Sequence, residues 1–219
     1  MSTVNRTRVF VDFWNFQLSW NDRAGRAGCD WPRLPAGLAS RTSQVLAAGG
    51  VASDVSLDET LVYASARPGA PDANLRRWLT TFLDRQPGFR VKVRERRLRS
   101  HEVHCRQCGT DTVACPSCGA PFERAPEKGV DSAIVTDLLS LAVEGAFDLA
   151  ILVTSDADMI PAVEWVQARG LKVVNAGWAG HGYDLMRACW GSFQLDDLVP
   201  SLVRAGSEKP TTHDEGERT

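Results

Sequence analysis

The chain has 219 residues, of which 43% are hydrophobic and 24% charged, a balance ordinary for one globular domain with a small insert. Its 25 basic and 27 acidic residues give a net charge of −2, which excludes a uniformly basic protein that coats nucleic acid. No apolar run approaches the roughly 18 residues of a transmembrane helix, and residues 1–8 lead into an apolar run too short for a signal peptide. We therefore expect a cytoplasmic protein with no membrane partner.

Short apolar runs alternate with helical periodicities along the chain. We expect strands at 8–12, 59–65, 89–94, 149–154 and 171–175, and helices at 34–48, 75–83, 130–143, 160–169, 183–189 and 198–203. Alternation repeated about five times predicts a doubly wound α/β fold around a parallel sheet. The domain is expected to span residues 1–206, interrupted by an insert at 101–122 and followed by a disordered polar tail at 207–219.

Four aspartates are expected at the sheet edge where ligands of such folds bind. Asp12 ends the first strand, Asp156 and Asp158 follow the fourth, and Asp131 begins the helix after the insert, in line with its core-facing stripe. Crowded carboxylates repel one another unless a cation neutralises them, and Mg²⁺ and Mn²⁺ prefer such oxygen ligands. These acids therefore predict a site for Mg²⁺ or Mn²⁺ of the kind that hydrolyses phosphodiesters.

Other interpretations of the polar residues near this edge stay open. Asp158 also fits an N-cap and Asp156 a turn residue, whereas Asn15 supplies an amide that can orient a water, a ligand or a phosphate. Asp137 lies about 120° around the helix from Asp131 and is interpreted as structural. The glycine-rich segment 177–182 is either a connector or a loop that touches substrate. No P-loop, dinucleotide-binding glycine motif or nucleophile elbow is present.

Four cysteines predict a structural zinc site in the insert. They form two C-x-x-C pairs, each followed by glycine, with six residues between the pairs. Four thiolates at this spacing can close a tetrahedral Zn²⁺ site, and duplication argues against a redox pair. The four ligands are Cys105, Cys108, Cys115 and Cys118, whereas Cys29 and Cys189 are expected to be buried apolar residues.

Residues 85–106 carry eight basic side chains against two acidic ones. Such a cluster beside an acidic metal site predicts a track for a phosphate backbone, formed by Arg94, Arg96, Arg97 and Arg99. The other interpretation is an edge strand protected by charge. Trp14, Trp20 and Trp178 can stack unpaired bases, although core packing explains each of them as well.

Four short motifs together resemble the NYN domain family of PIN-like nucleases. They read V-D-F-W-N at 11–15, K-G-V-D at 128–131, L-V-T-S-D-A-D at 152–158 and G-L-K-V at 170–173, and the resemblance spans about residues 8–200 without the insert. It implies a PIN-like three-layer α/β/α sandwich and metal-dependent RNA cleavage. By position, Asp12, Asp131, Asp156 and Asp158 match the metal-binding acids, and Asn15 matches the polar residue of the first motif. The family's glycine and aromatic residue around the last two acids are missing here.

We therefore expect a metal-dependent endoribonuclease whose zinc insert and basic strand help to bind single-stranded or structured RNA. Two other functions remain open: a catalytically weak PIN-like module that binds RNA or protein, and a structure-specific or single-strand DNA nuclease. The sequence also leaves open a homo-oligomer or a protein partner.

Overall fold

The computed structural model describes residues 3–51 and 53–204. The predicted tail at 207–219 and the last two residues of the predicted domain lie outside the described residues.

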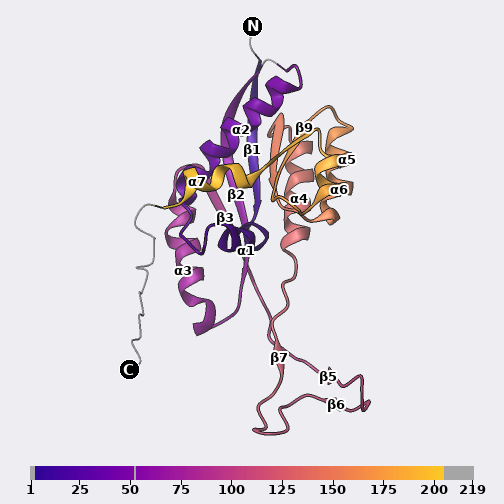
Figure 1. Cartoon of the computed structure of the whole chain (residues 1–219). Helices are drawn as coiled ribbons and strands as arrows, with labels where there is room; N and C mark the ends of the chain where they lie inside the picture. Colours follow the sequence, from indigo (N-terminus) through magenta and orange to yellow (C-terminus); the bar gives the residue numbers. More distant parts are fainter. Residues whose placement is uncertain (1–2, 52, 205–219) are drawn as a thin grey trace, which may run out of the picture.

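Six parallel strands form the central sheet in the order β10-β9-β8-β1-β2-β3 (Figure 1). Their bounds are β1 (Thr3–Asp12), β2 (Ser53–Ala66), β3 (Phe89–Glu95), β8 (Leu149–Val153), β9 (Lys172–Gly177) and β10 (Gly191–Gln194). The chain order reverses between β1 and β8, where Phe10 pairs with Leu152 and Val11 with Val153. In sheets of this kind the crevice beyond the carboxyl ends of two such strands is the usual ligand site.

Helices cover both faces of the sheet, which gives the three-layer α/β/α sandwich that the sequence predicts. One face is covered by α1 (Phe13–Arg23), α2 (Leu34–Ala48), α3 (Ala73–Thr81) and α7 (Val199–Leu202), and the other by α4 (Val130–Val143), α5 (Ile160–Gln167) and α6 (Tyr183–Ala188). Alternate residues of each strand enter opposite layers: Val9 and Val11 belong to the first core, and Phe10 to the second. Short 3₁₀ turns occupy Trp31–Arg33, Ala70–Asp72, Leu83–Arg85, Ala157–Met159 and Leu195–Leu198.

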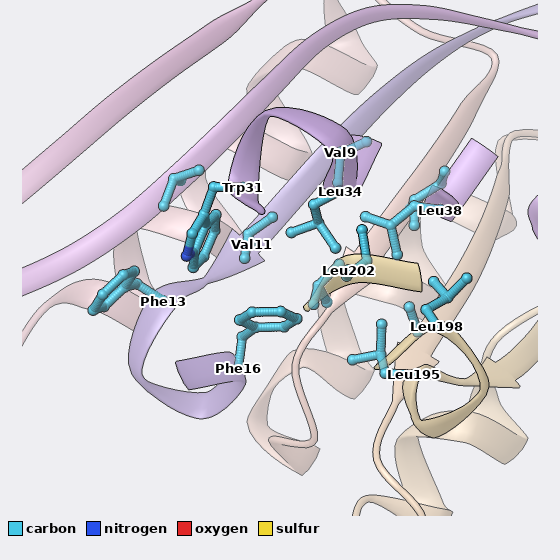
Figure 2. Packing of buried hydrophobic residues seen from close by; sticks show 14 of the residues in the cluster. Val9, Val11, Phe13, Phe16, Trp31, Leu34, Leu38, Leu195, Leu198 and Leu202 are labelled. Atoms are coloured by element: carbon cyan, nitrogen blue, oxygen red, sulfur yellow. The ribbon is translucent and has the colours of Figure 1, made fainter. Parts of the chain in front are cut away.

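The first core is rich in aromatic rings that fix the start of α1 (Figure 2). Phe13 stacks on Trp31 with ring centroids 5.4 Å apart, and Phe16 stacks on Trp20 at 5.8 Å. Each buried aromatic side chain stabilises the fold by about 2–3 kcal/mol through removal of apolar area from water. Trp20 and Trp178 are 0% and 1% exposed, so both pack in the core and present no face to a base.

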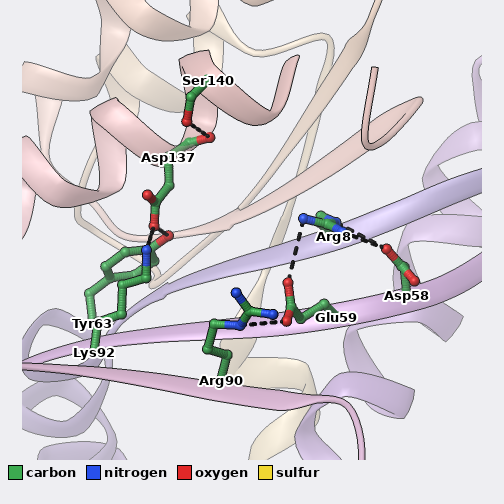
Figure 3. A network of polar contacts seen from close by, with 8 residues as sticks. All are labelled: Arg8, Asp58, Glu59, Tyr63, Arg90, Lys92, Asp137 and Ser140. Carbon is green, nitrogen blue, oxygen red and sulfur yellow. Dashed lines mark hydrogen bonds and ion pairs between the residues drawn. The ribbon is translucent and has the colours of Figure 1, made fainter. Parts of the chain in front are cut away.

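Polar contacts tie β2, β3 and α4 together on the second face (Figure 3). The Tyr63 hydroxyl and the Lys92 ammonium both donate to Asp137, at 2.6 and 2.5 Å. Nearer the start of β3, Arg90 pairs with Glu59 at 2.8 Å. Asp137 is therefore a structural residue, as its position on the helix predicts.

Sequence patterns predict most strands and α-helices of the sandwich closely but omit two of them, and they predict none of the short strands of the insert. The helices at 34–48 and 130–143 are confirmed at both ends, whereas the 59–65 strand is the end of a longer β2. No predicted element covers α1 or β10. The signal for α1 is present, because its buried residues Phe13, Phe16 and Trp20 recur at helical spacing.

The insert projects from the sandwich as an arm between β3 and α4, in which the chain runs out and returns antiparallel to itself (Figure 1). We call residues 97–126 the arm. It contains two antiparallel pairs, β4 (Arg99–Ser100) with β7 (Glu123–Arg124), and β5 (Val103–His104) with β6 (Asp111–Thr112). The first pair lies on either side of the predicted 101–122 range.

Among the described residues no helix is long and apolar enough to cross a bilayer.

Candidate metal centre at the carboxyl edge of the sheet

Asp12 occupies the point where the strand order reverses. It ends β1 and caps α1, because its Oδ1 accepts a hydrogen bond from the Asn15 backbone N–H at 3.2 Å. The residue is only 8% exposed. Burial is the largest of the causes that together raise the pKa of Asp12 to about 6. The negative charges of Glu127 and Asp131 act in the same direction, and the hydrogen bond from the Asn15 N–H acts against them.

Two hydrogen bonds join the start of α1 to the loop after β8. The Asn15 side-chain oxygen accepts from the Ser155 N–H at 3.0 Å, and the Thr154 hydroxyl lies 3.4 Å from Asp12 Oδ2. The Thr154 hydroxyl also accepts from the Asp156 N–H at 3.3 Å. Asn15 therefore acts first as a clamp that positions the loop carrying two of the predicted ligands.

Asp156 and Asp158 share a short 3₁₀ turn before α5. The Asp156 Oδ1 accepts from the Asp158 N–H at 2.9 Å, so Asp156 is the residue that caps this turn. The alternative in which Asp158 is the N-cap of α5 is wrong, because Met159 occupies that position.

Asp131 is solvent-exposed at the first turn of α4, whereas Val130 and Ile134 beside it are buried. The expectation that its side chain follows the core-facing stripe is wrong, because Val130, Ala133 and Ile134 form the buried face of the first turns and Asp131 lies outside it. Partial desolvation raises the pKa of Asp131, and the charges of Asp156, Glu127 and Asp158 raise it further. The charge of Asp131 acts on Asp12, and the charges of Asp156 and Asp158 act on Asp131, so the predicted aspartates are linked electrostatically along this edge.

Glu127 is a fifth carboxylate that sequence reasoning missed. It is the only residue outside the predicted set whose charge raises the pKa of both Asp12 and Asp131 among the described residues. Its Oε1 accepts from the Ser65 hydroxyl at 2.6 Å, and its Oε2 lies 3.1 Å from the Arg96 guanidinium. Glu127 directly precedes the K-G-V-D motif, and this adjacency is the signal in the sequence that could have marked it as a site residue.

The donor chemistry of these acids suits a hard divalent cation, because every donor is a carboxylate oxygen and their negative charges repel one another. In the structure as it stands, no three His, Cys, Asp or Glu side chains of residues 3–51 and 53–204 are gathered into a group that could hold a metal ion. Burial and neighbouring negative charges nonetheless disfavour the ionised form of Asp12, and a bound cation would stabilise that form.

The predicted arginine track divides into two kinds of side chain. Arg94, Arg97 and Arg99 line, together with Lys128, a pocket of about 280 Å³ at the base of the arm. Within the described part of the chain, the side chains of these four cations form no ion pair and no hydrogen bond. Arg96 differs, because it pairs with Glu127 and its guanidinium lies over the Trp14 ring, 5.1 Å from the centroid.

The glycine-rich segment 177–182 packs against the same edge. A Cβ on Gly182 would lie 2.8 Å from the Ser155 Cα, and Gly182 has a φ of +66°, so only glycine fits there without a shift. The segment therefore buttresses the loop that carries Asp156.

The four cysteines lie on two turns with the same backbone pattern. Gly109 N–H donates to the Cys105 carbonyl and Gly119 N–H to the Cys115 carbonyl, each at 2.8 Å. Both glycines have positive φ, 71° and 70°, which explains the glycine after each pair.

Hydrogen bonding with Thr110 lowers the pKa of the Cys108 thiol to about 7, which favours the thiolate that binds zinc. All four thiols are free, and the two pairs are not gathered into one group in the described chain. Cys189 is buried and Cys29 partly buried.

Comparisons with known proteins agree with this architecture. A family model described as NYN domain matches residues 6–196. A crystal structure of a protein of unknown function from Vibrio parahaemolyticus has a similar fold, with a TM-score of 0.55 and 19% identity over 88% of this chain and 94% of the other. No curated protein matches the chain.

Proposed function

The chain belongs to the NYN domain family, which consists generally of PIN-like nucleases, and on that premise we propose that it is a metal-dependent endoribonuclease. The observation that carries the proposal is the set of carboxylates at the β1–β8 edge, where burial and, to a lesser extent, neighbouring negative charges raise the pKa values of Asp12 and Asp131. A structural cluster would pair such acids with cations, whereas here only Glu127 has a basic partner in the described chain.

Asp12, Asp131, Asp156 and Asp158 would hold Mg²⁺ or Mn²⁺. When bound, such a cation activates water and stabilises the oxygens of an in-line displacement at phosphorus. The protein's own part is positioning: Asn15 and Thr154 join the two loops that carry the ligands. Arg96 holds Glu127 beside Asp12, and the pair limits the negative charge at the edge.

Three arginines and a lysine without acidic partners would bind the substrate backbone. Arg94 is the next-to-last residue of β3, Arg97 and Arg99 follow the strand, and Lys128 precedes α4, at the same sheet edge as the carboxylates. Cations at such an edge attract polyanions and offset the repulsion between phosphates and the acids. We assign the four cysteines to one structural Zn²⁺ that would order the arm, from the spacing and the two matching turns.

The test is a cleavage assay with labelled single-stranded RNA, hairpin RNA and single-stranded DNA, each with Mg²⁺, Mn²⁺ or EDTA. We expect RNA cleavage that needs the cation and is absent in the Asp156→Asn variant. Equal cleavage of DNA would overturn the substrate assignment. RNA binding without cleavage under every condition would overturn the enzyme and favour a regulatory binding module.

A further inference from the structure

A pocket of about 310 Å³ opens between α1 and α3, beside the carboxylate edge. Its lining includes four aromatic side chains, Phe13, Trp14, Trp31 and Trp78, together with polar groups such as Gln17 and Arg204. A smaller pocket of about 210 Å³ shares Trp31 and Trp78 and adds Phe82. The larger volume lies at the lower end of the range for small-ligand sites, so the occupant is about the size of one flat ring system.

The rings of this pocket form a supported stack and not a loose patch. Trp31 contacts Phe13 face to face and Trp78 edge to face, with centroids 5.4 and 5.9 Å apart. Phe13 and Trp31 are buried, whereas Trp14 and Trp78 are half-buried and keep part of their surface for the pocket. The buried pair fixes the exposed pair, which is the rigidity that a stacking platform needs.

Trp14 is the wall between this pocket and the carboxylates. Its indole N–H donates to the Ser65 carbonyl at 2.7 Å, and the Ser65 hydroxyl donates to Glu127 at 2.6 Å. The Arg96 guanidinium lies over the same ring. The pocket is therefore one residue, Ser65, away from Glu127, and the cation over the ring belongs to the ion pair with that glutamate.

We propose that this pocket holds one unpaired base of a nucleic acid chain, next to the phosphate that lies at the carboxylates. The inference rests on the proposed nuclease function and deepens it. Aromatic rings bind the face of any base, so the pocket selects unpaired nucleotides and not a sequence. A base within a duplex is stacked and paired and cannot enter, so cleavage is directed to single-stranded segments.

The first test uses the unaltered protein. Single-stranded RNA oligomers that carry one 5-iodouracil are irradiated with the protein in EDTA, and the adducts are mapped by mass spectrometry. The proposal expects adducts on Trp14 or Trp78, the two indoles of the pocket that keep exposed surface. Adducts confined to other parts of the chain would overturn it, and because no variant is used, misfolding cannot confuse the result.

The second test compares two tryptophan variants. Trp78→Leu keeps an apolar side chain but removes the stacking face, and should weaken binding of single-stranded RNA in EDTA roughly tenfold. Trp190→Leu removes a partly exposed indole that precedes β10, at the opposite edge of the sheet, and should leave affinity unchanged. The thermal midpoints of both variants check the fold.

The outcomes separate this proposal from the nuclease itself. If the unaltered protein neither binds nor cleaves RNA, the proposed function fails. If it cleaves RNA but Trp78→Leu, folded, binds like the unaltered protein, only the pocket assignment fails. Equal affinity for single-stranded and fully paired RNA in the unaltered protein would also overturn the pocket assignment.

Discussion

The carboxylate edge and the arm hold their functional groups by different means. Asp12 ends a strand whose residues Val9, Phe10 and Val11 are fully buried, and side-chain hydrogen bonds join the start of α1 to the loop after β8. In the arm the paired strands are two residues long, and Leu98, Val103 and Val113 are 52%, 40% and 49% exposed. Hydrophobic burial thus supports the edge but not the arm.

This difference teaches where a metal ion is needed for shape. At the edge, core packing keeps like charges together although they repel, so the metal-free site stays folded with raised pKa values. In the arm, backbone turns shape each cysteine pair separately, and no core joins them. Small structures without a core usually depend on a metal or disulfides, so we expect zinc to order the arm and a hard cation only to activate the edge.

The largest expected effect breaks the function of the edge without changing its shape. Asp156→Asn keeps the oxygen that accepts from Asp158 N–H but removes the charge. We expect RNA cleavage to fall about a thousandfold, since cation-dependent stabilisation is worth several kcal/mol. Asp58→Asn, an exposed acid paired with Arg8, is the matched control. Similar rates in the two variants would contradict the proposed site.

The next effect separates the arm from the core. The unaltered protein, purified without added metal, should contain about one zinc per chain. In Cys105→Ser, hydrogen exchange should show loss of protection at 99–124 with little change in β1 and β8. Unchanged protection in a zinc-free preparation would show that the arm orders itself without metal.

A smaller effect tests whether the base of the arm serves the edge. Replacing Arg94, Arg97 and Arg99 with Gln should flatten the slope of log affinity against log salt by about 0.7 for each lost phosphate contact on a single strand. Turnover at saturating RNA should largely recover, because the loss is one of uniform binding. Arg85→Gln, which removes one positive charge before the start of β3 and away from the edge, is the control for a single lost charge and is compared with Arg97→Gln alone. An unchanged slope in the triple variant would leave these arginines as a charged edge that prevents strand pairing.

The smallest effect measures the cost of holding a buried negative charge at the edge. Because the pKa of Asp12 is raised to about 6, its ionisation destabilises the folded protein as pH rises from about 4 through 6. Asp12→Asn preserves an N-cap residue, so in EDTA at pH 7 it should stabilise the protein by about 1–3 kcal/mol, with the difference vanishing near pH 4.

Asp148→Asn is the opposite control, since its partner Arg6 lowers the pKa of Asp148. That substitution should destabilise slightly at pH 7, and less as pH falls. Urea unfolding at three pH values gives both signs, and a destabilised Asp12→Asn at pH 7 would contradict the electrostatic description of the edge.

Local patterns in the sequence account for much of this protein. Apolar runs and helical periodicity predict the parallel sheet and the helices at 34–48 and 130–143, and strand ends place Asp12 and Asp156 at one edge. The cysteine spacing and its glycines predict two tight turns, which the structure contains. Each of these depends on neighbours within a few residues, and such information is present in the chain itself.

Tertiary structure alone decided which distant side chains meet. Glu127 acts on Asp12 and pairs with Arg96, whose guanidinium lies over Trp14. These residues meet only because β1 and β3 end, and α4 begins, at the same edge of the sheet. The aromatic pocket likewise combines Trp14 and Trp31 with Trp78, residues that belong to separate elements. Periodicity says which face of an element is apolar, but the contact between two elements is set by packing over the whole sheet, which no local pattern records.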